Sequence, residues 1–207
     1  MITLELSKLY AITDRGMIQK TLAEDIAAAV RGGVGMVQLR EKNIAEEQYI
    51  AYAAEALSIC RELGARLIIN DSISVCAAVG ADGVHLGQGD ADPKEARCIL
   101  GSKAIIGVTA KTVDQAVRAA ADGADYIGSG AVFGTSTKTD AVKMDMDTLR
   151  AITAASEVPV YAIGGINAEN ISQLRGSGIY GAAVVSGIFK GDIEKNAALL
   201  KKEVELL

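Results

Sequence analysis

The feature that most limits the fold of this chain is the regular alternation of short apolar runs with longer amphipathic stretches. Eight runs predict strands, and most are nearly continuous in apolar residues, as strands buried on both faces are. They are Leu9–Asp14, Val34–Arg40, Arg66–Asn70, Gly83–Leu86, Ala104–Val108, Tyr126–Ser129, Val160–Ile163 and Ala182–Ser186. Apolar residues recur at helical spacing between them, for example over Ala45–Leu63 and Thr112–Asp122. The alternation predicts right-handed crossovers and a parallel sheet.

Glycine segments precede every second predicted strand, at residues 32–35, 80–83, 123–125 and 178–181. Glycine allows a helix to end in the left-handed conformation and the chain to turn into the next strand. This regular punctuation favours a closed barrel over an open sheet. The chain has 207 residues, close to the minimum for eight strand–helix units. We therefore predict a single-domain (β/α)8 TIM barrel that spans residues 1–207.

The composition excludes several classes of function. The net charge of −5 and the pI of about 5.0 give no general attraction to nucleic acid or to an anionic membrane surface. We expect no secretory signal, and no apolar run reaches the roughly 18 residues that span a bilayer. Cys60, Cys76 and Cys98 lack metal-ligand spacing and are expected to be small buried apolar residues. We predict a cytoplasmic protein with small-molecule partners, and a homo-oligomer stays open.

Charged residues follow the second predicted strand directly, in the segment Gln38-Leu39-Arg40-Glu41-Lys42. Alternation along a strand places Gln38, Arg40 and Lys42 on one face and Leu39 and Glu41 on the other. The active sites of such barrels lie at the carboxyl ends of the strands, so an amide and two cations converge there. An arginine fork and a lysine ammonium suit phosphate oxygens. A solvated charge run is the alternative.

Two aspartates follow neighbouring strands: Asp71 after the third, beside Asn70, and Asp90 after the fourth. Adjacent strands lie roughly 4.8 Å apart, so both carboxylates can approach one ion. Mg²⁺ typically takes one or two protein carboxylates together with waters and phosphate oxygens. The two aspartates match that demand of a Mg²⁺ site. Helix capping or a turn is the alternative, above all for Asp71.

Hydroxyl-bearing residues follow the fifth and sixth predicted strands. Thr109 can hydrogen-bond a substrate or cap the next helix, and its sequence context favours neither role. The loop from Phe133 to about Met146 is longer than a simple connection needs, which indicates a functional lid. Three hydroxyls and a lysine in it suit phosphoryl oxygens: Thr135, Ser136, Thr137 and Lys138. A flexible polar loop without such a role is the alternative.

The last two strand ends are rich in glycine, with Gly164-Gly165 after the seventh and Val185-Ser186-Gly187 after the eighth. Their backbone N–H groups can approach a phosphate, and loops in this position often bind one. Glycine for close packing is the alternative. His85, the only histidine, is expected to be a hydrogen-bonded imidazole in the core rather than a catalytic group.

Taken together, these segments resemble the thiamine-phosphate synthase family in order from residue 9 to about residue 189. They are Tyr10–Asp14, Gln38–Lys42, Asn70-Asp71, Val84–Gln88 with Asp90, Gly107–Thr109, Ala124–Gly128, Thr135–Lys138, Ala162–Ile166 and Val184–Ser186. The glycine elements occur in many phosphate-binding barrels. The combination of Gln38–Lys42, Asn70-Asp71 and Asp90 is specific.

The resemblance implies that a hydroxymethylpyrimidine diphosphate is joined to a thiazole phosphate, which yields thiamine phosphate and diphosphate with the help of Mg²⁺. It implies catalytic roles for Arg40, Lys42, Thr109 and Lys138, and metal binding by Asp71 and Asp90. The implied substrate-binding residues are Gln38, Leu39, Arg40, Glu41, Lys42, Asn70, Thr109, Thr135, Ser136, Thr137, Lys138, Gly165, Val185 and Ser186.

Three positions depart from the family pattern: Thr109 replaces a common serine, Lys111 a common histidine and Gly134 a common proline. Threonine keeps the hydroxyl, and none of the three changes removes a charge that the diphosphate needs. The alternatives are a thiazole tautomerase-type isomerase, a non-catalytic barrel that binds a phosphate ligand, and a sugar-phosphate epimerase. The two aspartates and the lack of a histidine at Lys111 argue against the tautomerase, and the charges at the second, third, fourth and sixth strand ends argue against a non-catalytic barrel. An epimerase would not need the Gln38–Lys42 segment together with the two aspartates.

Overall fold

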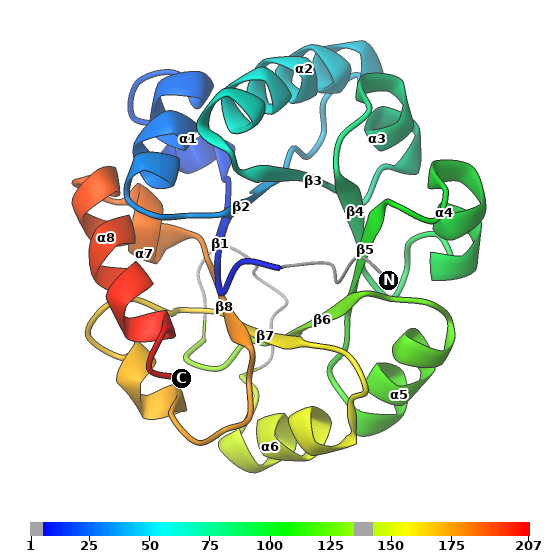
Figure 1. The fold of residues 1–207 in the computed structure, drawn as a ribbon, viewed down its shortest axis with the longest axis vertical. Coiled ribbons are helices and arrows are strands. Elements are labelled where there is room, and N and C mark those ends of the chain that lie inside the picture. Colours follow the sequence, from blue (N-terminus) through cyan, green and yellow to red (C-terminus); the bar gives the residue numbers. More distant parts are fainter. Residues whose placement is uncertain (1–5, 135–142) are drawn as a thin grey trace.

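The computed structural model describes residues 6–134 and 143–207. Eight parallel strands follow one another in sequence order around a closed barrel, with β1 hydrogen-bonded to β8 (Figure 1). The strands are β1 Leu9–Ile12, β2 Met36–Leu39, β3 Arg66–Asn70, β4 Gly83–Leu86, β5 Ile105–Thr109, β6 Tyr126–Gly130, β7 Val160–Ile163 and β8 Gly181–Val184. The predicted (β/α)8 barrel is confirmed, and every strand lies within two residues of its predicted bounds.

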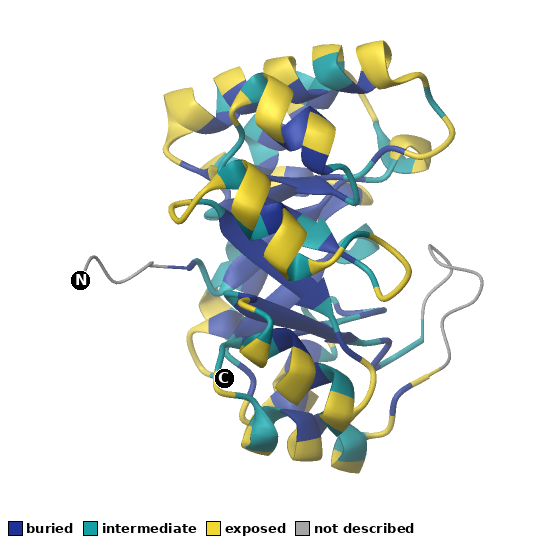
Figure 2. Ribbon diagram, turned by 90° about the vertical axis from the view of Figure 1, so that its right-hand side faces the viewer, coloured by how far each residue is buried: buried dark blue, intermediate teal, exposed yellow. Residues whose placement is uncertain are grey.

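Helices surround the barrel and turn their exposed faces outward, while the strands are buried (Figures 1 and 2). They are α1 Leu22–Arg31, α2 Glu46–Leu63, α3 Ile73–Val79, α4 Pro93–Leu100, α5 Val113–Ala121, α6 Met146–Ala155, α7 Ser186–Phe189 and α8 Ile193–Val204. Two 3-10 helices, η1 Arg15–Met17 and η2 Ile171–Leu174, complete the ring. Among the described residues, none of the helices combines the length and apolar character that crossing a bilayer requires.

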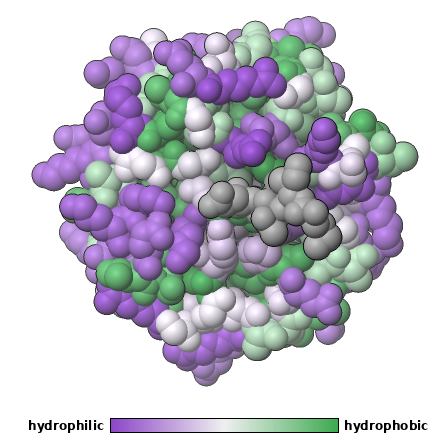
Figure 3. Space-filling view, viewed as in Figure 1, coloured by the Kyte–Doolittle hydropathy of each residue, from purple (hydrophilic) through white to green (hydrophobic). Residues whose placement is uncertain are grey.

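The surface face in Figure 3 mixes hydrophilic and hydrophobic residues rather than presenting one continuous apolar patch.

The cysteines follow the sequence prediction only in part. Cys60 and Cys76 are buried, and burial raises the pKa of each thiol to about 12. The prediction for Cys98 is wrong, because this residue is exposed on α4. Cys98 lies on the solvent-facing side of the amphipathic helix α4, where a small residue is tolerated.

The core has two layers, because successive side chains of each strand point to opposite faces of the sheet. The outer layer lies between the sheet and the helices and includes Leu39, Leu67 and Val84. The inner layer fills the barrel with larger side chains, among them Tyr10, Met36, Ile68, Ile105, Tyr126 and Tyr161. Three tyrosine rings meet edge to face there, with centroids 5.3–5.8 Å apart. They close the barrel beneath its carboxyl end.

Gly107 makes room for this packing. It is paired with Tyr126 in the register of β5 and β6, and a Cβ atom at Gly107 would overlap the Tyr126 ring. A glycine in mid-strand weakens a sheet unless something approaches it closely. Here the tyrosine ring occupies the volume that a side chain would take.

We predict that Gly107→Ala lowers the free energy of unfolding by about 1–3 kcal/mol, because the added methyl group overpacks the barrel interior. Urea denaturation measures the change. Gly89→Ala is the matched control, since a Cβ there has no atom within 4 Å and Gly89 has no positive φ. Equal stability of the two variants would contradict the packing role of Gly107.

Candidate active site

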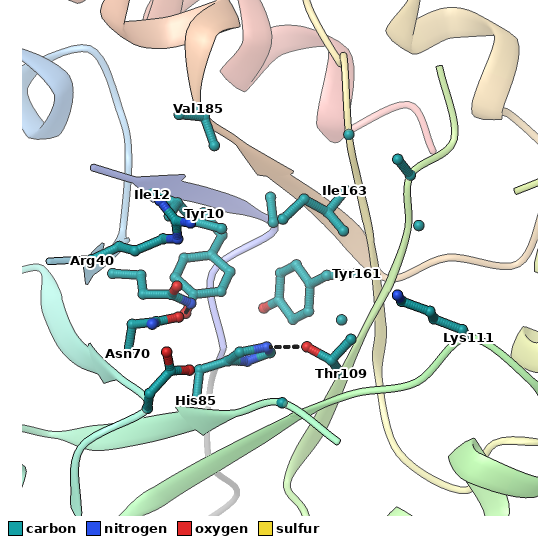
Figure 4. Close-up of a pocket in the computed structure, with 18 of the residues that line it drawn as sticks. Tyr10, Ile12, Arg40, Asn70, His85, Thr109, Lys111, Tyr161, Ile163 and Val185 are labelled. Carbon is teal, nitrogen blue, oxygen red and sulfur yellow. Dashed lines mark hydrogen bonds between the residues drawn. The ribbon is translucent and has the colours of Figure 1, made fainter. Parts of the chain in front are cut away.

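A cavity of about 370 Å³ opens at the carboxyl ends of the strands (Figure 4). Residues from all eight strands or the loops that follow them line it. The predicted site residues that it brings together are Gln38, Arg40, Lys42, Asn70, Asp71, Asp90, Thr109, Gly165, Val185 and Ser186. Thr135, Ser136, Thr137 and Lys138 lie outside the described residues, as does most of the predicted lid.

Gln38, Arg40 and Lys42 reach the cavity from β2 and its loop, in the alternation expected from the sequence. The backbone N–H of Arg40 donates to Thr13 Oγ1 at 3.0 Å, which fixes the start of the loop. The Arg40 guanidinium lies 3.6 Å from the Asp14 carboxylate, and both side chains are about four-fifths buried. The loop after β1 therefore orients the arginine that the loop after β2 supplies.

Leu39 and Glu41 do not line the cavity. The Leu39 side chain is fully buried between the sheet and the helices. The Glu41 carboxylate is buried and accepts two hydrogen bonds from Arg15 at 2.8 Å each. The Arg15 guanidinium in turn lies 4.1 Å from the centroid of the Tyr52 ring. Both side chains follow the outward half of the alternation, so we assign neither a direct contact with a substrate.

The carboxylates of Asp71 and Asp90 interact at the ends of β3 and β4. Burial raises the pKa of Asp71 and contact with Asp90 raises it further, while Lys42 opposes the shift. Asp71 has a φ of 64°, which is uncommon for a residue other than glycine, and its N–H donates to the His85 carbonyl at 2.9 Å. The helix-cap alternative for Asp71 is wrong, because Ser72 caps α3.

Asp90 stabilises the turn in which it lies, because its carboxylate accepts a hydrogen bond from the Gly87 N–H at 2.6 Å. The turn role and a metal role are compatible, because a carboxylate has several acceptor positions. Two neighbouring carboxylates form a hard-oxygen donor set that fits Mg²⁺, which takes its remaining ligands from water and phosphate. The described residues contain no group of three or more such ligand side chains, so a cage built from protein alone is absent there.

Thr109 turns its hydroxyl toward His85, with 2.9 Å between Oγ1 and Nε2 (Figure 4). It does not cap α5, because Thr112 does so. The other ring nitrogen of His85 lies 3.0 Å from the Tyr126 hydroxyl. The imidazole is hydrogen-bonded, as predicted, but it is only partly buried and lines the cavity instead of lying within the core.

Gly164 and Gly165 have φ values of 104° and 66° and face the loop after β6. A Cβ at Gly164 would lie 2.5 Å from the Ala131 side chain, and one at Gly165 would overlap the Gly134 carbonyl. Close packing, the alternative from the sequence, therefore explains why both positions require glycine. Both residues also line the cavity, so the two roles coexist.

Sequence reasoning missed several residues at the bottom and side of the cavity. Tyr10, Ile12, Tyr161 and Ile163 lie at inward positions of β1 and β7 and give the cavity an apolar wall (Figure 4). The two-residue alternation within each strand is the signal that could have found them. Gln88 was also missed; its amide donates to the Thr109 carbonyl at 2.6 Å and joins the loop after β4 to β5.

Comparison with known proteins identifies the family. A family model described as thiamine monophosphate synthase matches residues 9–188. The chain belongs to this family. The resemblance inferred from the sequence motifs is thereby confirmed.

Individual relatives are similar in sequence to this protein over nearly its whole length. Thiamine-phosphate synthase of Ruminiclostridium cellulolyticum is 46% identical over 93% of this chain and 92% of its own length. The Fusobacterium nucleatum protein of that name is 44% identical over 96% and 94%. The solved structure of thiamine phosphate pyrophosphorylase from Pyrococcus furiosus has a TM-score of 0.88 and 36% identity, covering 96% of this chain and 95% of that one.

We predict that Arg15→Ala lowers the free energy of unfolding by about 1–3 kcal/mol, because it leaves the Glu41 carboxylate buried without its partner. Arg31→Ala is the matched control: the Arg31–Glu194 pair is about half exposed on both sides, and such pairs contribute less than about 1 kcal/mol. Chemical denaturation of both variants measures the difference. If Arg15→Ala cost no more than Arg31→Ala, the Arg15–Glu41 pair would not be a structural requirement.

Proposed function

We propose that this protein condenses a hydroxymethylpyrimidine diphosphate with a thiazole phosphate, forming thiamine phosphate and releasing diphosphate. The observation that carries the proposal is the meeting of Arg40 and Lys42 with the Asp71–Asp90 pair in one cavity. Membership of the thiamine monophosphate synthase family supports it. A sugar-phosphate epimerase would need the barrel and its glycines but not this combination of cations and paired carboxylates.

The reaction requires charge stabilisation and positioning more than proton transfer. The bond between the exocyclic methylene and the diphosphate oxygen breaks, and its electron pair leaves with the diphosphate. The electron-rich aminopyrimidine stabilises the cation on the methylene carbon. The thiazole nitrogen then donates its lone pair to that carbon and forms the new bond without losing a proton. Fixed positive charge near the leaving group and an in-line nucleophile are therefore sufficient.

The cavity residues fit these requirements. The planar fork of Arg40, oriented by Asp14, can bind two oxygens of one phosphoryl group. Lys42 supplies a compact second charge, and we assign Lys138 to the same task from the sequence motif alone. We assign Gln38, Asn70 and Thr109 to the pyrimidine diphosphate. Thr135, Ser136, Thr137, Gly165, Val185 and Ser186 are proposed to bind the thiazole phosphate.

Asp71 and Asp90 would hold Mg²⁺, and their interacting carboxylates provide the oxygen ligands that this ion prefers. The bound ion would neutralise diphosphate charge. The Asp71 carboxylate interacts with that of Asp90 from a backbone position with a φ of 64°. We also propose that the partners are small-molecule substrates, with neither nucleic acid nor membrane involved, and that the protein is cytoplasmic.

The reaction itself is tested by measuring diphosphate release from the purified protein with both substrates, with Mg²⁺ and with a chelator. We expect release only when the thiazole phosphate and Mg²⁺ are both present, with thiamine phosphate as the product. Tight binding of thiazole phosphate without turnover would favour the tautomerase-type or non-catalytic alternative instead.

The metal assignment predicts that Asp71→Asn lowers Mg²⁺-dependent turnover more than about tenfold, because a ligand carboxylate is lost. Asparagine tolerates a positive φ better than most residues, so the backbone at this position is preserved. Asp147→Asn on α6 is the control, since its side chain is 94% exposed. Turnover and its Mg²⁺ dependence are measured for both variants. A normal Mg²⁺ response in Asp71→Asn would remove Asp71 from the metal site.

A further inference from the structure

A continuous chain of five polar side chains crosses the bottom of the cavity from β2 to β5. Gln38 Nε2 lies 2.6 Å from the Tyr10 hydroxyl, which lies 2.8 Å from the Tyr126 hydroxyl. The Tyr126 hydroxyl lies 3.0 Å from His85 Nδ1, and His85 Nε2 lies 2.9 Å from Thr109 Oγ1. Both ends, Gln38 and Thr109, line the cavity. The chain therefore joins two walls of the site through the core.

The two tyrosines inside this chain are neutral and carry one proton each. Both side chains are fully buried, and burial raises the pKa of each phenol well above its ordinary value. A neutral hydroxyl has one proton to donate, and inside the core that proton is left unpaired, at a cost in free energy, unless one of the two hydrogen-bonding neighbours accepts it. The direction of one link therefore determines the direction of the next.

The Gln38 end sets that direction. The amide nitrogen of Gln38 can only donate, so Tyr10 accepts there and gives its own proton to Tyr126. Tyr126 then gives its proton to His85 Nδ1. A neutral imidazole that accepts at Nδ1 carries its proton on Nε2, which donates to Thr109 Oγ1. The Thr109 hydroxyl proton is then left for another acceptor.

We propose that every hydrogen bond in the chain from Gln38 to Thr109 has one fixed donor-to-acceptor direction. Through this fixed order, Tyr10, Tyr126 and His85 act as positioning residues for the substrate. The order leaves Thr109 as a hydrogen-bond donor and the Gln38 carbonyl oxygen as an acceptor. The reverse order would exchange these roles at both ends together. The chain thus fixes which hydrogen-bonding pattern the two walls offer to a ligand.

The consequence for the substrate rests on the proposed function. An aminopyrimidine carries an amino donor and ring nitrogens that accept, so it complements an acceptor on β2 and a donor on β5. A ring with the pattern exchanged would leave unpaired polar groups on both walls, which costs affinity. Threonine at position 109 retains the hydroxyl on which the order ends, so this departure from the family pattern preserves the chain.

The histidine tautomer tests the proposal directly, because His85 is the only histidine among the 207 residues. Tag-free protein labelled with ¹⁵N-histidine gives imidazole signals from this residue alone. We expect one neutral tautomer, with the proton on Nε2 and none on Nδ1. In Tyr126→Phe, which removes the donor to Nδ1, we expect a mixture of tautomers.

Tyr161→Phe is the matched control. Tyr161 packs edge to face on both Tyr10 and Tyr126, but its hydroxyl donates to the Ser7 carbonyl at 2.7 Å, outside the chain. The same loss of one buried phenol oxygen should leave the His85 tautomer unchanged. Tyr10→Phe breaks the chain one link further away and serves as the second test variant, with a mixture of tautomers again expected.

A proton on Nδ1 in the unaltered protein, or an imidazolium, would overturn the proposed order. So would tautomers in Tyr126→Phe and Tyr10→Phe that match those in Tyr161→Phe. These spectra need no substrate, so they are independent of whether the proposed condensation is correct.

Kinetics test the positioning role separately. Tyr126→Phe should raise KM for the pyrimidine diphosphate roughly tenfold, the effect of one disordered hydrogen bond, and leave KM for the thiazole phosphate unchanged. The effect should vanish when Thr109→Val is already present. Equal rises for both substrates, or full additivity with Thr109→Val, would count against the positioning role.

Discussion

Closure of the sheet between β1 and β8 is the constraint on which the rest of the structure depends. Tyr10 pairs with Ala183 in this register, and the barrel has no free edge. An eight-stranded barrel has an interior just wide enough for side chains to fill. Each strand therefore gives alternate residues to the interior and to the helices. Closure also brings all eight carboxyl ends to one rim, where residues as distant as Gln38 and Val185 share a cavity.

The interior packing that results is both a core and the bottom of the site. Tyrosines fill the barrel, and small residues such as Gly107 and Ala183 leave room for their rings. A buried phenol must find a hydrogen-bond partner or destabilise the fold by about 1–3 kcal/mol. Tyr10 and Tyr126 satisfy each other, and each also bonds a residue that lines the cavity. The packing that stabilises the barrel thereby determines the polarity of the cavity walls.

The sequence was sufficient for the features that depend on local pattern. Apolar runs gave the strands, and alternation separated Gln38, Arg40 and Lys42 from Leu39 and Glu41. The same alternation turns the Leu39 and Glu41 side chains away from the cavity. What could not be predicted depends on register between distant segments. Arg15 and Glu41 are 26 residues apart and Tyr10 and Tyr126 are 116 apart. Nor could local sequence choose between Thr109 and Thr112 as the cap of α5, because each threonine precedes the same helical pattern.

The charges around the cavity bear on the Mg²⁺ site proposed at Asp71 and Asp90. The whole chain has a net charge of −5, so it offers no general attraction to an anion. Arg15 pairs with the buried Glu41 carboxylate, which does not line the cavity. Among the described residues, the cations that line the cavity are Arg40, Lys42 and Lys111, and the carboxylates that line it are Asp71 and Asp90, while Asp14 pairs with Arg40. Within the described part of the chain the carboxylates of Asp71 and Asp90 therefore oppose the attraction of a diphosphate to these cations. A divalent cation held by Asp71 and Asp90 would turn that repulsion into attraction, and the carboxylate pair and the cations would then bind the anion together.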